Sequence, residues 1–379
     1  MERLSWLVGE RSIPYYLGTD CFEEIAAHLH SLETDRFILI SDRKVIPRIG
    51  ESLASALRGY AAVDLLEFPE GENHKTLTYL EKLAETAIWH GATRKSVLVG
   101  IGGGLVGNVT GLLAALLFRG VRFVHVPTTL LAMHDSVTSL KQAVNCGNVK
   151  NVIGAYYAPE MILADTGVLE TLPLRHWRAG AVELAKNALI LGNDFHELLP
   201  PLLRDIESRS SSLGRQMVKL GVRAKAGLLH TDPTEKSGAI IFEYGHTVGH
   251  ALELESEGAL THGEAVAWGM LCAAEISHKL GYLSEAARQA HWDLLRLTGT
   301  LEMLPSWMDP GRIMTRIYHD NKRGACSHEL SDIPMVLLQG IGVPVMGPAT
   351  MLVLAPDEIV HSAISAVLHS CESVPCGQA

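Results

Sequence analysis

The feature that most limits the fold of this chain is an alternation of short apolar runs and longer helical stretches over its first half. Five runs read as strands, because each is rich in branched or aromatic residues and is bounded by turn or polar residues. The predicted strands are 37–40, 63–66, 96–101, 123–126 and 161–164. Helix-like stretches, among them 77–90 and 106–118, lie between them. Parallel strands joined by crossover helices produce this order, so we predict a Rossmann-like α/β layer.

From about Leu172 onward the pattern is mostly helical, and strand-like runs such as 352–354 are few. The chain has 379 residues, of which 47% are hydrophobic, and this is enough for two domains with separate cores. We therefore predict an α/β domain over residues 1–170 and a mostly α-helical domain over residues 171–379. The boundary rests on the change of pattern alone.

Composition narrows the possible partners of the protein. The net charge is −10 and the pI is about 6.0, which disfavours nucleic acid and anionic membranes as partners. No stretch approaches the roughly 18 uncharged apolar residues of a membrane span, and the first residues lack the apolar core of a signal peptide. Six cysteines without a Cys-x-x-Cys pair indicate free thiols. We predict a cytoplasmic protein that acts on a small molecule.

The strongest chemical signal is a histidine-rich stretch in the second half. His246 and His250 are four residues apart and would share one face of a helix, and His262 follows with the carboxylate of Glu264 close by. Borderline divalent metals such as zinc favour imidazole together with a carboxylate, and Glu183 is a candidate carboxylate upstream. A lone His-x-x-x-His is more often a pair of surface histidines. The third imidazole and the carboxylates favour a metal site here.

A glycine-rich turn follows the strand predicted at 96–101. Gly102, Gly104 and Gly107 satisfy G-x-G-x-x-G, with a strand before and a helix after. Such glycines let the backbone approach a pyrophosphate, and the helix N-terminus offers N–H donors. The motif does not follow the first strand, and no acid stands about 20 residues later, so Asp42 is the candidate for the ribose. A tight turn without a ligand is the alternative.

Polar residues gather in two further places of the first half. The loop 71–76 follows a strand and opens a helix, and it could equally be an ordinary capped helix start. Asp135, Lys141, Lys150 and Asn151 then come in quick succession. Ammonium groups bind phosphate, while carboxylate and amide groups bind hydroxyls, so this set suits an anionic, hydroxylated ligand. As isolated charges these residues would be solvated surface positions.

Taken together, these motifs resemble the sugar phosphate cyclases, the family of 3-dehydroquinate synthase. The similarity covers nearly the whole chain, and so many short matches in one order are specific for the family. The matches are Gly71-Glu72 with Lys75-Thr76, Gly102-Gly103-Gly104 with Gly107, Arg119-Gly120, Pro127-Thr128-Thr129-Leu130-Leu131-Ala132, Asp135-Ser136, Lys141 with Ala143-Val144-Asn145, Lys150-Asn151, Ala179-Gly180 with Glu183 and Lys186, Gly245-His246-Thr247 with Gly249-His250-Ala251, and His262-Gly263-Glu264-Ala265.

The resemblance implies an NAD-binding Rossmann-like domain and a helical metal- and substrate-binding domain, with the active site in the cleft between them and homodimers common. It implies one divalent ion, zinc or cobalt, held by Glu183, His246 and His262. The NAD-binding residues that it implies are Asp42, Glu72, Lys75, Gly103, Gly104, Asn108, Thr128, Thr129, Lys150 and Thr171. The substrate-binding residues that it implies are Arg119, Asp135, Asn151, Lys186, Lys225 and Lys322.

Three residues take catalytic roles on the same resemblance. His250 would transfer a proton, since imidazole titrates near neutral pH. Lys141 would hold the phosphate of the substrate together with Lys322, and Glu243 would bind a sugar hydroxyl or help to move a proton.

Departures from the family pattern bear on the substrate. Dehydroquinate synthase has an arginine a few residues before the metal histidine, which holds the substrate carboxylate, and here that position is Ala239. An unpaired carboxylate in a closed site costs several kcal/mol, so we expect a substrate without one. Asn108 and Glu243 also stand where that enzyme usually has Asp and Asn. Asn108 and the stretches 139–145, 241–246 and 319–324 resemble the branch of the family that converts glucose 6-phosphate into the carbocycle of aminoglycoside antibiotics.

Three alternative activities stay open. Dehydroquinate synthase itself is disfavoured by Ala239. A 2-epi-5-epi-valiolone synthase acting on sedoheptulose 7-phosphate also needs no carboxylate clamp. Metal-dependent polyol dehydrogenases of the glycerol dehydrogenase type share the architecture, but they would release NADH and they lack the lysine-rich segment from Lys141 to Asn151.

Overall fold

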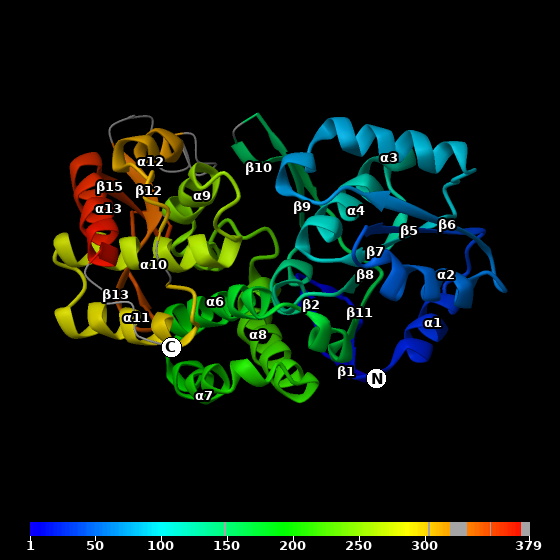
Figure 1. The fold of residues 1–379 in the computed structure, drawn as a ribbon, viewed down its shortest axis with the longest axis horizontal. Helices are drawn as coiled ribbons and strands as arrows, with labels where there is room; N and C mark the ends of the chain where they lie inside the picture. The colour runs from blue at the N-terminus through cyan, green and yellow to red at the C-terminus, as the bar shows by residue number, and fades with distance from the viewer. Residues whose placement is uncertain (148, 302–303, 319–331, 349, 373–379) are drawn as a thin grey trace. The chain divides into compact units, whose positions relative to one another are not determined.

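The computed structural model describes residues 1–147, 149–301, 304–318, 332–348 and 350–372. The chain packs into two compact units, each of which is described by itself (Figure 1). Unit 1 is Met1–Pro173 with Ser208–Thr234, and unit 2 is Leu174–Glu207 with Glu235–Ala379. The units therefore interleave along the sequence, whereas the predicted domains 1–170 and 171–379 are continuous. That simpler division stays a prediction.

A seven-stranded sheet forms the middle of unit 1, in the order β1-β4-β11-β8-β7-β5-β6. Its strands are β1 Glu2–Leu4, β4 Tyr15–Gly18, β5 Arg36–Asp42, β6 Ala62–Phe68, β7 Val97–Gly102, β8 Arg122–Pro127 and β11 Met161–Asp165. Neighbouring strands pair in parallel, except that β1 is antiparallel to β4. The five predicted strands are β5, β6, β7, β8 and β11, so the predicted parallel layer is confirmed.

Helices cover both faces of this sheet because its central strands are apolar on both sides. Successive side chains of a strand point to opposite faces. In β5, Ile38 and Ile40 enter the core shared with α3 and α4, while Phe37 and Leu39 enter the core shared with α1 and α2. These helices are α1 Phe22–His30, α2 Glu51–Leu57, α3 Leu77–Trp89 and α4 Gly104–Leu116.

The other elements of unit 1 place further polar residues. An antiparallel hairpin packs against α4, and α8 packs against α5. A Cβ atom at Gly221 of α8 would lie 2.7 Å from Cβ of His134, so glycine allows α8 its close approach. The elements are β2 Leu7–Val8, β3 Arg11–Ser12, α5 Leu130–His134, β9 Lys141–Cys146, β10 Val149–Tyr156, α8 Ser211–Thr231, the π-helical turn η1 Ile46–Gly50, and the 3-10 turns η2 Glu72–His74, η3 Leu117–Arg119, η4 Ser136–Thr138 and η5 Thr166–Thr171. The 3-10 turn η6 Ile206–Ser208 lies where the chain passes from the residues of unit 2 to those of unit 1.

Unit 2 is mostly helical, and α10 packs against α6, α9, α11 and α13 (Figure 1). Two glycines of α10 permit this. A Cβ atom at Gly269 would lie 2.1 Å from the carbonyl oxygen of Gly245, and one at Gly263 would lie 2.2 Å from that of Ala179. The elements are α6 Leu174–Leu191, α7 Asn193–Arg204, η7 Gly238–Glu243, α9 His246–Glu255, α10 His262–Lys279, α11 Glu285–Leu297, α12 Pro310–Ile317, α13 Asp357–Glu372 and the antiparallel pairs β12 Asp332–Val336 with β15 Leu352–Pro356 and β13 Leu338–Gly340 with β14 Val343–Pro344.

Two further findings concern membrane-spanning helices and cysteines. None of the helices in the described part of the chain is long and apolar enough to cross a membrane. Among the described residues, Cys21, Cys146 and Cys272 are free cysteines.

A buried histidine in β8 should make unit 1 sensitive to acid. His125 is 2% exposed, and neither of its ring nitrogens hydrogen-bonds to any of the described residues. Burial lowers the pKa of His125 to about 3, whereas the same side chain in an unfolded chain titrates near about 6.5. Between these values the unfolded state takes up the proton and the folded state does not. The free energy of unfolding should therefore fall by about 2 kcal/mol from pH 7 to pH 5.

The variant His125→Gln tests this expectation, because glutamine cannot be protonated. Denaturant midpoints of the variant should depend less on pH between 7 and 5 than those of the parent protein, even if the variant is less stable at pH 7. His361→Gln serves as the control, since His361 lies exposed on α13. Equal pH dependence in the parent and in His125→Gln would contradict the expectation.

Candidate functional site

Three side chains of unit 2 come together in a group that fits a metal ion. Glu183, His246 and His262 each offer one ligand atom, and these atoms all lie within 4.8 Å of one another. From Oε1 of Glu183, Nε2 of His246 lies 3.7 Å away and Nε2 of His262 lies 3.5 Å away. Two imidazoles and a carboxylate form the ligand set of catalytic sites for zinc or related divalent metals, which keep a further position open.

Each candidate ligand lies on a helix: Glu183 on a buried face, and His246 and His262 at the first residue of their helices. Glu183 lies in a buried stretch of α6 and is 0% exposed. His246 begins α9 directly after Gly245, whose φ of +77° is left-handed and suits glycine. His262 begins α10, where Thr261 and Glu264 form a capping box. The local sequence thus fixes where two of the helices begin, and packing against α10 brings all three residues together.

Charged and titratable side chains lie close together around this group. Lys186, one turn after Glu183, is buried and forms an ion pair with it. Burial alone would raise the pKa of Glu183, but Lys186, His246 and His262 outweigh it and hold that pKa well below its usual range. Burial, and after it Lys186, lowers the pKa of His246 to about 3. A buried site with one carboxylate and closely spaced imidazoles suits a cation, which requires deprotonated ligand nitrogens.

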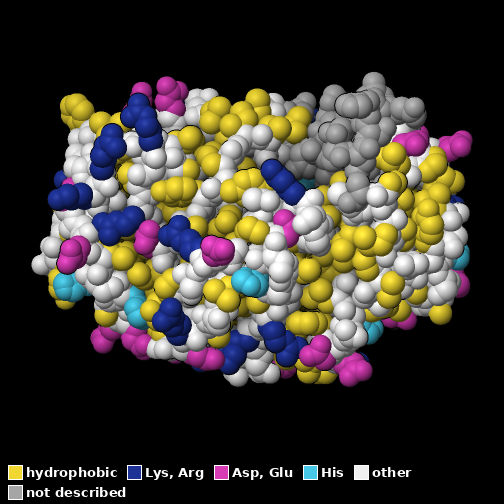
Figure 2. Space-filling model, turned by 180° about the vertical axis from the view of Figure 1, so that it is seen from behind, with side chains coloured by type: hydrophobic (Ala, Val, Ile, Leu, Met, Phe, Trp, Pro, Cys, Tyr) yellow, Lys and Arg dark blue, Asp and Glu magenta, His cyan; other side chains and the backbone are white. Residues whose placement is uncertain are grey.

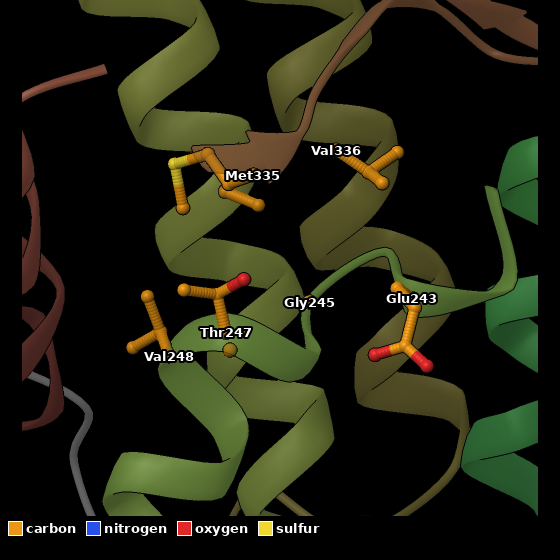
Figure 3. A pocket seen from close by; sticks show the side chains of 8 residues that line it. Glu243, Gly245, Thr247, Val248, Met335 and Val336 are labelled. Carbon is orange, nitrogen blue, oxygen red and sulfur yellow. The ribbon is translucent and has the colours of Figure 1, made fainter. Parts of the chain in front are cut away.

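His250 and Glu243 lie beside the ligand group without belonging to it. The ring centroid of His250 is 5.3 Å from that of His246 and 6.0 Å from that of His262. The pair four residues apart therefore supplies one ligand, and His262 supplies the second imidazole. Glu243 ends η7 and, with Thr247 and residues of β12, lines a small pocket next to the start of α9 (Figure 3).

The carboxylate that faces His262 differs from the one that lies nearest in sequence. The oxygens of Glu264 accept hydrogen bonds from the backbone N–H of Thr261 and from Arg175, each at 2.7 Å. Oε2 of Glu253 instead lies 3.0 Å from Nδ1 of His262. Glu253 is missing from the predicted site residues. Its spacing of seven residues from His246, which is two helical turns, is the signal that could have found it.

A second cluster of predicted residues forms in unit 1 around the buried Lys75. Its Nζ donates to Oδ1 of Asn108 at 3.1 Å and to Oδ1 of Asn151 at 2.5 Å. Oε1 of Glu72 lies 4.0 Å from Nζ of Lys75 and 3.4 Å from Nζ of Lys150. The structure thus joins five residues that the resemblance assigns to NAD or substrate.

Asn145 of β9 holds this cluster together, although it is absent from the predicted site residues. Its backbone N–H donates to the carbonyl oxygen of Lys75 at 2.8 Å. Its side-chain Nδ2 donates to Oε1 of Glu72 at 3.0 Å, and its Oδ1 accepts the backbone N–H of Asn151 at 2.9 Å. Asn145 therefore ties the β9–β10 hairpin to the loop 71–76. Its position in the matched Lys141 to Asn145 motif was the available signal.

The remaining predicted NAD residues gather at the carboxyl edge of the sheet. Asp42 ends β5, Gly103 and Gly104 follow β7, and Thr128 and Thr129 follow β8, and these three strands are neighbours. A Cβ atom at Gly103 would lie 3.3 Å from Cγ2 of Thr129, so glycine relieves a tight contact between this turn and the segment after β8. Helix α4 begins at Gly104 and directs its first N–H groups to the same edge. This cradle fits the pyrophosphate of a dinucleotide.

Two further predicted residues of unit 1 are Arg119 and Thr171. Arg119 is exposed at the end of η3, beyond the far end of α4, which at 13 residues is about 20 Å long. Thr171 ends η5, where its hydroxyl donates to the carbonyl oxygen of Val168 at 2.9 Å. The described contacts do not join either residue to the cluster around Lys75, so their roles stay predictions.

Asp135 and Lys225 form an ion pair, with Oδ1 and Nζ 2.7 Å apart. Lys141 begins β9 and is half-buried. Lys322, predicted to bind the substrate phosphate, lies outside the described residues.

Comparison with known proteins places the chain in a family. Residues 65–179 match the family model described as 3-dehydroquinate synthase N-terminal, and residues 180–323 match the one described as 3-dehydroquinate synthase C-terminal. The chain therefore belongs to the 3-dehydroquinate synthase family, and the predicted resemblance is confirmed.

Similar proteins within that family are named for one particular activity. The chain is 42% identical over 352 residues to the 2-deoxy-scyllo-inosose synthase of Streptomyces kanamyceticus, covering 93% of this chain and 90% of the relative. It is 39% identical over 360 residues to that of Micromonospora echinospora, covering 95% and 91%.

A solved structure extends the likeness to three dimensions. The crystal structure of a 2-deoxy-scyllo-inosose synthase complexed with carbaglucose-6-phosphate, NAD⁺ and Co²⁺ matches with a TM-score of 0.90 at 38% identity, covering 96% of this chain and 99% of that one. The predicted fold, a Rossmann-like N-terminal domain followed by a mostly helical one, is confirmed.

Proposed function

We propose that this protein is a 2-deoxy-scyllo-inosose synthase, a lyase that converts D-glucose 6-phosphate into 2-deoxy-scyllo-inosose and phosphate. The supporting observation is the grouping of Glu183, His246 and His262 in a chain that is 42% identical to such a synthase over 93% of its length. The activity is that of an NAD- and metal-dependent sugar phosphate cyclase. NAD⁺ would be reduced and oxidised again within one turnover, so that no net NADH forms.

The metal group of unit 2 and the cradle at the carboxyl edge of the sheet in unit 1 would hold the two cofactors. When bound, NAD⁺ would supply reversible hydride transfer at C4 of the sugar, and a divalent ion, zinc or cobalt, would supply Lewis acidity toward the oxygen on C4. Glu183, His246 and His262 would hold the ion. The glycine turn at Gly103 and Gly104 and the start of α4 receive the pyrophosphate.

The side chains of the protein move protons and hold the phosphate. His250, next to the ligand group, transfers a proton, and Glu243 binds a sugar hydroxyl or takes part in that transfer. Lys141 binds the phosphate, which leaves C6 by β-elimination once C4 is a ketone and the proton on C5 has been removed. Asp135 and Lys186 are candidates for the sugar hydroxyls. The final aldol closure is intramolecular, so holding one conformer of the open chain lowers its barrier.

The choice of a substrate without a carboxylate is supported by Ala239. This residue of η7 is 0% exposed and offers no cation where dehydroquinate synthase has its carboxylate-binding arginine. Glucose 6-phosphate and sedoheptulose 7-phosphate both meet this condition. The identity to 2-deoxy-scyllo-inosose synthases favours the first.

The decisive experiment incubates the protein with glucose 6-phosphate, Co²⁺ and a catalytic amount of NAD⁺. We expect phosphate release many times in excess of NAD⁺, no accumulation of NADH absorbance, and a carbocyclic ketone as product. Sedoheptulose 7-phosphate and glycerol are run in parallel. Stoichiometric NADH without a carbocycle would identify a dehydrogenase, and turnover of sedoheptulose 7-phosphate alone would identify the other cyclase.

We also propose a cytoplasmic homodimer that serves the 2-deoxystreptamine route of aminoglycoside antibiotic synthesis. Apolar side chains reach the surface in several places (Figure 2). In unit 1, Trp89 is 89% exposed and Ile88 beside it is 52% exposed, and we propose these two side chains as a candidate dimer contact. Sedimentation velocity of the purified chain would distinguish a dimer from a monomer.

A further inference from the structure

The two imidazoles of the metal group have different partners behind them. Nδ1 of His246 lies 3.1 Å from the backbone carbonyl oxygen of Tyr244. Nδ1 of His262 lies 3.0 Å from Oε2 of Glu253, a carboxylate. In both residues Nε2 is the ring nitrogen nearest to Glu183. The two candidate ligands therefore present the same ring atom to an ion, but only one of them is backed by a charged acceptor.

This arrangement determines the tautomer of His262. A neutral imidazole carries one N–H, and an acceptor at Nδ1 places that hydrogen on Nδ1. The lone pair of Nε2 then points toward Glu183. Metal-bound histidines commonly donate their second ring N–H to a carboxylate or carbonyl group, which fixes the ring orientation and increases the basicity of the ligand. A carboxylate does this more strongly than a carbonyl oxygen because the hydrogen bond is charge-assisted.

Glu253 is held in position by the last turn of α9. The side chain of Glu253 is 14% exposed. The hydroxyl of Ser256 donates to the backbone carbonyl oxygen of Glu253 at 2.8 Å. The next acidic residue of the same turn, Glu255, is 1% exposed and pairs with Arg312 and Arg316 of α12. Helix α9 thus carries His246 at its start and Glu253 two turns later, so one rigid element aligns a ligand and the acceptor behind another ligand.

We infer that Glu253 is a positioning residue of the metal centre, which holds His262 in the tautomer and orientation that bind the ion. The inference rests on the metal-dependent function proposed above. Glu253 lies outside the group of candidate ligands, so its loss should weaken metal binding without removing a ligand. Glu264 cannot substitute, because its carboxylate is engaged by Thr261 and Arg175.

The test measures metal affinity directly in the full chain. Apo-protein is titrated with Co²⁺ against a chelator of known affinity, and the visible absorption of the bound Co²⁺ is recorded. We expect Glu253→Gln to bind Co²⁺ about 10- to 100-fold more weakly than the parent and to show a changed Co²⁺ spectrum. Glu257→Gln removes an equal charge from an exposed neighbouring position and should bind as the parent does.

The outcomes separate this inference from the function on which it rests. Parent protein that binds no Co²⁺ overturns the metal centre and both proposals. Parent protein that binds Co²⁺, with Glu253→Gln equal to it in affinity, overturns only the role of Glu253. If Glu253→Gln does not fold, nitrogen NMR of the Zn²⁺-loaded parent provides the test. We expect His262 to be protonated at Nδ1 and bound through Nε2, and binding through Nδ1 would overturn the inference.

Discussion

Replacing Glu183 by glutamine is expected to remove the divalent ion and, with it, nearly all turnover. The amide keeps the volume of the side chain but lacks the negative charge that two imidazoles cannot supply. A Lewis acid contributes several kcal/mol to this kind of oxidation, and each 1.4 kcal/mol is about a tenfold change in rate, so a loss of more than about 100-fold is expected. Metal analysis of the purified variant and phosphate release from glucose 6-phosphate measure the two effects.

The same substitution should also destabilise unit 2, for a separate reason. Glu183 and Lys186 are 0% and 2% exposed, so the variant leaves a buried ammonium without its carboxylate. Removing one partner of a buried ion pair costs about 3–5 kcal/mol. The double variant Glu183→Gln with Lys186→Met should recover much of that stability and none of the metal. Stability and metal content are thereby measured as independent quantities.

Glu197→Gln is the matched control, since Glu197 lies exposed on α7 of the same unit. It should keep its metal, its stability and its activity. A Glu183→Gln protein that retained one ion per chain would show that the ligand set is wrong. Normal stability of that variant would show that the pair with Lys186 does not form in solution.

The parallel sheet could be predicted from the sequence because its strands are buried on both faces. The residues of β7, Val97–Gly102, are all buried, and this produces the continuous apolar run that marks such a strand. The β9–β10 hairpin gives no such signal. In β10, Val149–Tyr156, exposed and half-buried residues dominate, and the register shifts between Val149 and Ile153. The pairing of this hairpin therefore depends on tertiary contacts, which the local sequence pattern does not show.

The assignment of α8 to a unit could not be read from the sequence for a similar reason. Periodicity shows that a helix has a buried face, but it does not show which surface covers that face. Gly221 allows α8 to approach His134 of α5, and this contact joins Ser211–Thr231 to the first unit. The change of sequence pattern near residue 170 does not reveal that Ser208–Thr234 packs with the first unit again.

The metal group was predictable in part. The imidazoles and the buried Glu183 stand out because charged groups are rare in apolar helices. The identity of the carboxylate behind His262 was not predictable from adjacency. Glu264 is nearer in sequence, but a capping box and Arg175 occupy it, while Glu253 reaches His262 from the preceding helix. Capping and metal ligation compete for the same residue types, and only the three-dimensional packing decides between them.

Replacing Lys225 by methionine is the second substitution from which we expect a large effect. Lys225 is buried in α8, and its Nζ lies 2.7 Å from Oδ1 of Asp135 and 3.0 Å from the carbonyl oxygen of the same residue. Gly221, one turn earlier, brings α8 close enough for this double contact. Methionine fills the space of the lysine stem but leaves the Asp135 carboxylate without its cation. The free energy of unfolding should fall by about 3 kcal/mol, as measured by denaturant titration.

A second lysine on the same helix provides the control. Lys219 pairs with Glu2 at 2.9 Å, but the two side chains are 47% and 39% exposed, so Lys219→Met should change stability by less than about 1 kcal/mol. The double variant Asp135→Asn with Lys225→Met should be more stable than Lys225→Met alone, because it removes the stranded charge as well. Turnover of glucose 6-phosphate should fall in Lys225→Met and in the double variant, since Asp135 and Lys225 are both assigned to the substrate. Equal stability of Lys225→Met and Lys219→Met would contradict the burial argument.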